Sequence, residues 1–194
     1  MAAQSAYPVE VVGLYQERVH RLLWLVKWIL VIPHAIVLWF LSIPIIFTLP
    51  LSWAIIIVTG KYPEFLWAYH AGIIRWNWRV NYYSYEAGGT DRYPPFSFQS
   101  RDDYPADLNI EYSERSSRLT TLFRWLLAIP HWIVVYFLDT IRGILVLFAL
   151  LAVLFTGRYP DSMFEIIMAM NRWTYRVSAY GMLLVDEYTP FSFD

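Results

Sequence analysis

The sequence predicts a mainly α membrane protein that is built as a tandem pseudo-two-fold repeat. Three observations lead to this fold class. The 194 residues are 58% hydrophobic and only 16% charged, whereas soluble domains average roughly 45–50% apolar and about 25% charged residues. Residues 28–58 contain no Asp, Glu, Lys or Arg. The two halves of the chain also match each other, so a surface that needs lipid or a large partner to cover it occurs twice.

A shift of 97 residues superimposes the two halves. Ile-Pro-His occurs at 32–34 and 129–131, Thr-Gly-Lys/Arg-Tyr-Pro at 59–63 and 156–160, and Arg-Trp-x-x-Arg-Val at 75–80 and 172–177. The aromatic tails at 93–98 and 188–193 match at a shift of 95. This ordered set indicates duplication and predicts one repeat over residues 1–99 and a second over residues 100–194.

Each repeat begins with a short stretch of alternating apolar residues, which predicts a half-buried cytoplasmic strand near Val9 and Val11 and another near Leu108 and Ile110. An apolar block follows. A straight helix over residues 28–58 would be about 46 Å long, and the hydrocarbon core of a bilayer is about 30 Å thick. Prolines also interrupt the block. We therefore expect each block to form a membrane helical hairpin, and its short second arm is compatible with a full crossing or with a shallow re-entrant insertion.

The predicted hairpins cover residues 22–58 and 119–155, and charge supports them. Asp139 and Arg142 divide the second block and are expected at a hairpin tip. Hairpins then place every lysine and arginine except Arg142 on one side of the membrane, as the positive-inside rule requires. Both termini are expected in the cytoplasm.

Amphipathic helices follow the apolar blocks, over residues 63–80 and 160–177, because the Gly and Pro of the preceding turn mark a helix end and a new helix start. We expect these helices to lie at the membrane interface. An aromatic, proline-containing tail ends each repeat.

Taken together, the Ile-Pro-His, Thr-Gly-Lys/Arg-Tyr-Pro and Arg-Trp-x-x-Arg-Val motifs and the Tyr-Pro-Pro-Phe ending resemble the bacterial domain-of-unknown-function family 4389. The resemblance covers both halves. It implies a multi-pass protein of the bacterial inner membrane and brings no activity, substrate or catalytic residue.

Basic and aromatic side chains on the amphipathic helices are candidates for contact with lipid headgroups. Arginines four residues apart share a helix face, arginine binds phosphate with two parallel hydrogen bonds, and tryptophan favours the interface. The alternative is that these arginines pair with carboxylates or carbonyl groups of the protein. The candidates, with the two turn cations, are Arg75, Trp76, Arg79, Arg172, Trp173, Arg176, Lys61 and Arg158.

His34 and His131 occupy matching positions in the apolar blocks. Paired imidazoles could ligate haem, or each could bind a neighbouring carbonyl group. No other cofactor, no metal site and no catalytic constellation is predicted. The net charge of −1 argues against nucleic-acid binding.

Three functions remain. The first is a non-catalytic accessory or scaffold subunit, whose partners are membrane lipids and other membrane subunits. The second is a protein that binds lipid or another amphiphile through the Arg-Trp helices. The third is an electron-transfer or pigment subunit that uses the two histidines.

Overall fold

A computed structural model describes residues 7–193. The first repeat contains β1 (Val9–Gly13), a short 3-10 helix (Leu23–Leu25), α1 (Lys27–Leu30), α2 (Ile32–Ser42), α3 (Ile45–Thr59) and α4 (Glu64–Tyr83). The second contains β2 (Ala106–Ile110), α5 (Arg118–Thr156) and α6 (Asp161–Gly181). The predicted helical class and both predicted strands are confirmed.

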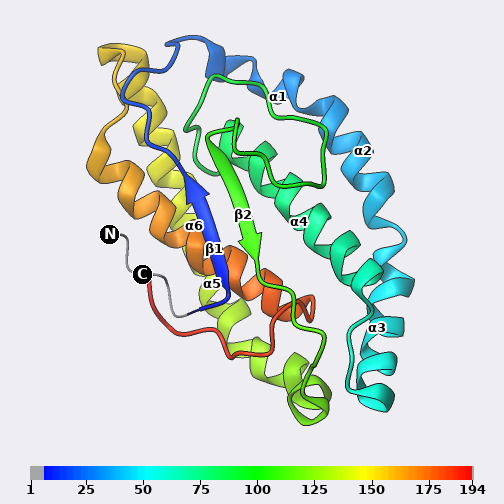
Figure 1. The fold of residues 1–194 in the computed structure, drawn as a ribbon. Coiled ribbons are helices and arrows are strands. Elements are labelled where there is room, and N and C mark those ends of the chain that lie inside the picture. The colour runs from blue at the N-terminus through cyan, green and yellow to red at the C-terminus, as the bar shows by residue number, and fades with distance from the viewer. Residues whose placement is uncertain (1–6, 194) are drawn as a thin grey trace.

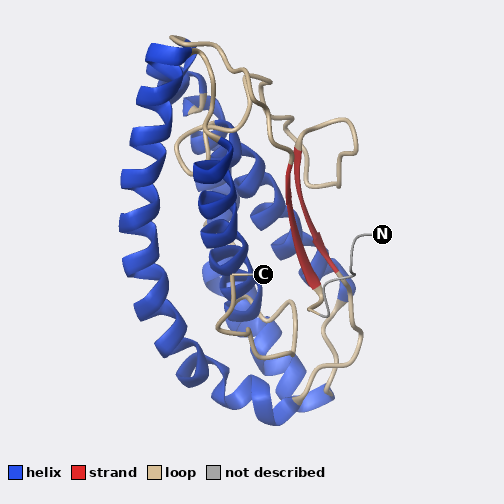
Figure 2. Ribbon diagram, turned by 90° about the vertical axis from the view of Figure 1, so that its left-hand side faces the viewer, coloured by secondary structure: helices blue, strands red, loops and turns tan. Residues whose placement is uncertain are grey.

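The elements form three layers (Figures 1 and 2). The two strands lie on one face of a central layer that contains α4 and α6. The outer helices, which are α1, α2 and α3 from the first repeat and α5 from the second, cover the other face of this layer. The central helices are therefore enclosed on two sides.

A pseudo-two-fold axis relates the repeats. The strands pair antiparallel, with Val11 opposite Leu108, and these two residues are also 97 positions apart. The 97-residue shift exchanges the remaining pairs with one another, since it carries the pair Val9–Ile110 onto the pair Ala106–Gly13. The main core lies around this axis and contains residues from both repeats. The repeats therefore share one core.

The hairpins predicted over 22–58 and 119–155 are wrong. The second block is one continuous helix of 39 residues. Its interior Pro130 does not reverse the chain. Arg142 is buried against polar groups of other elements, so its charge does not have to reach water at a hairpin tip. In the first block, α2 and α3 meet at a bend of 44°. Pro33 lies in the first turn of α2 and Pro44 is the N-cap of α3, so these prolines mark helix starts rather than a reversal.

The helices predicted over residues 63–80 and 160–177 are present as α4 and α6, and they lie between two layers of the protein rather than on its surface. Apolar and polar residues of α4 and α6 are both buried, because the outer helices cover one side and the strands and tails cover the other. Gly72 allows this packing on α4, since a Cβ atom there would lie 2.6 Å from the Cβ of Phe98 in the tail.

α5 buries two of its arginines and exposes mostly apolar side chains. Arg124, His131 and Arg142 are buried on the face that it turns toward the protein. Large apolar side chains cover its outward face, among them Leu119, Phe123, Trp125, Trp132, Phe137, Ile144, Phe148 and Phe155. α5 is also the one helix, among the described residues, that is long and apolar enough by itself to cross a membrane, with a mean hydropathy of 2.2 in its best window. The pair α2 and α3 passes the same test if the bend is ignored.

Candidate functional site

Arg75 and Arg79 on α4 bind the protein's own backbone. Arg75 Nε donates to Leu108 O at 2.7 Å and Arg75 Nη1 to Phe98 O at 2.8 Å. Arg79 is completely buried, and its Nη2 donates to Gln99 O at 2.7 Å. The carboxylate of Asp107 lies 3.7 Å from Arg75 Nε and 3.8 Å from Arg79 Nε. The two arginines therefore fasten the first tail and β2 to α4.

Burial lowers the pKa of the Arg79 guanidinium, and the neighbouring Asp107 carboxylate opposes this effect. The charge of Asp107 thus allows Arg79 to remain inside the protein. The site is asymmetric, because the position of Asp107 on β1 is taken by Glu10, which is exposed. This explains why the arginines of α6 have different partners.

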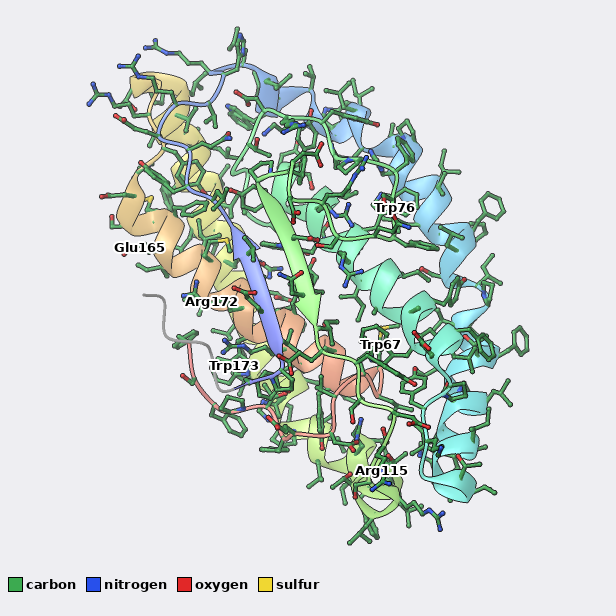
Figure 3. All side chains as sticks on the ribbon, viewed as in Figure 1. Trp67, Trp76, Arg115, Glu165, Arg172 and Trp173 are labelled. Carbon is green, nitrogen blue, oxygen red and sulfur yellow. The ribbon has the colours of Figure 1, made fainter. Side chains whose placement is uncertain are left out.

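On α6, Arg172 lies on the side of the second tail (Figure 3), and its Nη2 approaches Phe193 O at 3.3 Å. Arg176 is buried, and its guanidinium carbon lies 5.7 Å from the centre of the Tyr7 ring. Burial raises the pKa of Tyr7 to about 12. The headgroup role predicted for these positions is wrong for Arg79 and Arg176, because residues buried in the fold do not reach lipid.

Trp76 and Trp173 are buried too, and each binds the histidine of its own repeat. Trp76 Nε1 donates to His34 Nδ1 at 2.9 Å, and Trp173 Nε1 donates to His131 Nδ1 at 3.3 Å. The tail covers each ring, since the ring centre of Phe96 lies 3.8 Å from that of His34. Phe191 takes the same place over His131. The contacts do not bring the two histidines together, and the interfacial role predicted for the two tryptophans is wrong.

Lys61 and Arg158 are exposed on the turns before α4 and α6. Lys61 Nζ lies 2.5 Å from a carboxylate oxygen of Glu114, and Arg158 Nε lies 3.5 Å from one of Glu17. Each partner belongs to the other repeat. Backbone hydrogen bonds accompany these ion pairs, from Tyr62 N to Glu114 O and from Tyr159 N to Glu17 O. The Thr-Gly-Lys/Arg-Tyr-Pro motif therefore connects the two repeats.

Arg142 lies in the middle of α5, not at the tip predicted for it. Arg142 pairs with Asp139 three residues before it, with Arg142 Nη2 and Asp139 Oδ1 3.1 Å apart. Arg142 Nη1 also donates to Asn171 Oδ1 at 2.7 Å, and its Nη2 lies 3.5 Å from Glu86 Oε1. Burial raises the pKa of the Glu86 carboxyl, and Arg142 opposes this effect. Groups of both repeats thus meet beside α5.

Sequence reasoning missed the most deeply buried cations of the outer helices, Lys27 and Arg124. Lys27 Nζ donates to Thr90 O at 2.7 Å. Arg124 is the equivalent residue of the second repeat, 97 positions later, and its Nη1 donates to Val185 O at 2.9 Å. Arg124 Nη2 also lies 2.5 Å from Asp186 Oδ1. The sequence could have indicated these two residues, since a cation occurs at the same place near the start of both apolar blocks.

Within residues 7–193, no group of three or more His, Cys, Asp or Glu side chains could hold a metal ion. The comparisons agree with the internal duplication. A family model described as domain of unknown function (DUF4389) matches twice, over residues 21–97 and 118–194. No curated protein and no solved structure matches the chain.

Proposed function

The chain belongs to the DUF4389 family, and from this premise we propose that it is a non-catalytic membrane protein that acts as an accessory or scaffold subunit of a larger bacterial membrane assembly. One observation carries the proposal. The outward side of the outer helices is mostly apolar, whereas Lys27, Arg124 and Arg142 of the same helices are buried in the protein. This is the reverse of the polarity of a surface helix in water.

The length of α5 supports a position along the membrane rather than across it. Its 39 residues correspond to about 58 Å, which is far more than the roughly 30 Å of hydrocarbon core. Exposed apolar side chains extend from Leu119 to Phe155, and the exposed carboxylate of Asp139 at mid-length pairs with Arg142. Together with α1, α2 and α3, such a helix would enter one leaflet to the boundary between headgroups and acyl chains.

In this arrangement the central helices, the strands and the tails face the cytoplasm, where the positive-inside rule places basic loops. The inner membrane is the corresponding location in bacteria. The cytoplasmic layer then offers exposed aromatic side chains of the tails, such as Tyr93 and Phe96, as contacts for other subunits.

Spin-label depth measurements test the position in the membrane. The chain contains no cysteine, so Leu119→Cys, Phe137→Cys and Phe155→Cys each introduce a single labelling site along the outward face of α5. We expect equal, shallow depths at the three sites in vesicles of bacterial lipids. Leu14→Cys, exposed beside the strands, is the water-accessible control. A label at Phe137 that lies much deeper than the other two would show a spanning helix, and three water-exposed labels would overturn membrane association.

Native mass spectrometry of the protein extracted from its own membranes in mild detergent tests the scaffold role. We expect a discrete complex that is larger than the 23.0 kDa chain. Recovery of the chain alone, from cells in which it is not overproduced, would contradict an accessory subunit.

The alternative functions have less support from the geometry. Amphiphile binding through the Arg-Trp helices lacks free arginines at Arg75 and Arg79, since both bind backbone carbonyl groups. Haem binding by His34 and His131 would require both rings to leave their own aromatic neighbours. A Soret band in the purified protein that disappears in His34→Ala would favour haem binding.

A further inference from the structure

We propose that a pocket between α3 and the beginning of α5 binds one acyl chain of a glycerolipid, with the ester carbonyl of that chain at Thr121 and Arg124. The proposal rests on the membrane position proposed above. The pocket has a volume of about 520 Å³, which lies in the range of ligand-binding sites. Its walls are mostly apolar and include Trp53, Trp125 and Trp132.

Two polar atoms at this pocket have no partner in the protein. Thr121 is completely buried and Arg124 is 2% exposed. Thr121 Oγ1 and Arg124 Nε make no hydrogen bond, although both side chains line the pocket. Buried donors that stay unsatisfied cost free energy. A ligand atom that accepts hydrogen bonds from both groups would remove this cost.

The charge of the site selects a neutral acceptor. The other nitrogens of the Arg124 guanidinium are already occupied, because Nη1 binds Val185 O and Nη2 binds Asp186. The ion pair between Arg124 and Asp186 leaves the site without net charge. A phosphate would therefore compete with Asp186, whereas an ester carbonyl would not.

The position of the pocket matches the depth of lipid esters. Outer helices that lie in one leaflet place their apolar faces at the boundary between headgroups and acyl chains. Tryptophan side chains favour the same depth. A lipid with its ester group at Arg124 would extend its chain between Trp53 and Trp132, along the apolar wall.

The first repeat differs at the residues that form this pocket. Trp24 stands where the second repeat has Thr121, and it packs against the main core. The first repeat thus carries a large indole at the position where the second repeat has the smaller threonine.

Leu183, which lines the pocket, differs from its counterpart as well. It has a φ of 66°, the one positive φ among the described residues other than glycine, and Gly88 with a φ of 65° is its counterpart at the 95-residue shift. A leucine in this conformation is strained. The second repeat therefore has a strained leucine at a position where its side chain forms part of the apolar wall of the pocket.

Exchange of the two repeats' residues tests the proposal. Thr121→Trp puts into the pocket the side chain that the first repeat carries, and Phe137→Trp places the same indole on the outward face, away from the pocket. After exchange into lipid-free detergent, we expect native mass spectrometry to find one glycerolipid on wild type and on Phe137→Trp. We expect at least a tenfold lower occupancy on Thr121→Trp. Equal occupancy on the three proteins would overturn the site, as would the absence of lipid from wild type.

A second experiment tests the ester contact. Arg124→Lys keeps the positive charge opposite Asp186 and introduces the residue of the first repeat, Lys27, but it removes the Nε–H donor. In lipid-free detergent with one equivalent of phosphatidylcholine that carries brominated acyl chains, we expect a several-fold weaker quenching of tryptophan fluorescence. An unchanged quenching curve would overturn the role of Arg124. Displacement of the lipid by an isoprenoid quinone at equimolar concentration would overturn the assignment to an ester.

These measurements separate the pocket from the membrane position. Thr121→Trp leaves the outward face of α5 unchanged, so its spin-label depths at Phe137 should equal those of the wild-type background. Loss of bound lipid with unchanged depth identifies the pocket. Labels that are exposed to water in both backgrounds would overturn the membrane position itself.

Discussion

Individual side chains in this protein carry charge into the interior, where each finds a specific partner. Arg79 is the clearest example, because it is completely buried and lies among the carbonyl groups of the first tail and the carboxylate of Asp107. A buried ion pair contributes little compared with an apolar pair of the same shape, but removal of one partner leaves an uncompensated charge. Single substitutions at such positions should therefore be costly.

Arg79→Met should lower the free energy of unfolding by about 3 kcal/mol, because Asp107 stays buried with fewer partners. Denaturant titration in a fixed detergent measures this change. Arg92→Met is the matched control. Arg92 is 57% exposed and pairs with Asp103 at the surface, so its loss should cost less than about 1 kcal/mol. Similar losses for the two variants would show that the Arg79 contacts are not specific.

Glu86 should make stability depend on pH. Burial raises the pKa of its carboxyl in the folded protein, so the folded state holds this proton more tightly than the unfolded chain. The tighter binding of this proton adds its full contribution to the stability of the folded state below pH 4.5, the ordinary pKa of a glutamate. This contribution is lost as pH rises through the raised pKa of the folded state. Glu86→Gln should therefore gain stability relative to wild type as pH rises from 4 to 8.

Glu114→Gln is the control with the opposite sign. Its hydrogen bond from Lys61 lowers the pKa of the Glu114 carboxyl, and the resulting stability is lost as pH falls through that lowered pKa. Thermal unfolding of the three proteins at several pH values gives the two slopes. Parallel slopes for the two variants would contradict the effect of burial at Glu86.

At the scale of elements, α5 can continue through its charged middle because the buried guanidinium of Arg142 has partners on other elements. Asn171 and Glu86 bind Arg142 from α6 and from the segment after α4. Without these partners, a polar segment in an apolar block would have to reach water. The same sequence pattern is therefore compatible with a hairpin tip and with a buried network.

Two glycines in helices should respond in opposite ways. A Cβ atom at Gly143 in α5 would meet nothing within 4 Å, so Gly143→Ala should raise the free energy of unfolding by up to about 1 kcal/mol through helix propensity. A Cβ atom at Gly72 in α4 would overlap Phe98, and Gly72→Ala should cost roughly 1–3 kcal/mol. The melting temperatures of the two variants test this, and a stabilised Gly72→Ala protein would contradict the close packing of the tail.

On the scale of the whole molecule, the repeats depend on each other. The sheet takes one strand from each repeat, and each Thr-Gly-Lys/Arg-Tyr-Pro turn binds the other repeat. Tyr159 of the second repeat also donates from its hydroxyl to Ala87 O of the first, at 2.6 Å. Neither repeat encloses its own part of the core.

Residues 1–99 and 100–194, produced separately, should therefore fail to give cooperative unfolding, whereas production of both fragments in one cell should restore a folded pair. Copurification through a tag on one fragment measures the pairing. Glu114→Arg, which places two cations together at Lys61, should weaken it, and Glu165→Arg, at an exposed position of α6, is the control. A single fragment that unfolds cooperatively by itself would show independent repeats.

The sequence by itself determined the duplication, the helical class, both strands and the apolar composition, because each of these depends on residue identity and spacing. Only the tertiary structure decided where the polar residues of the apolar blocks go. The positions of Arg79, Trp76 and Arg142 depend on partners far away in the chain, such as Gln99, His34 and Asn171. A helical pattern shows which residues share a face but not which layer covers that face. The sequence therefore indicated an interfacial helix where the fold has a buried one.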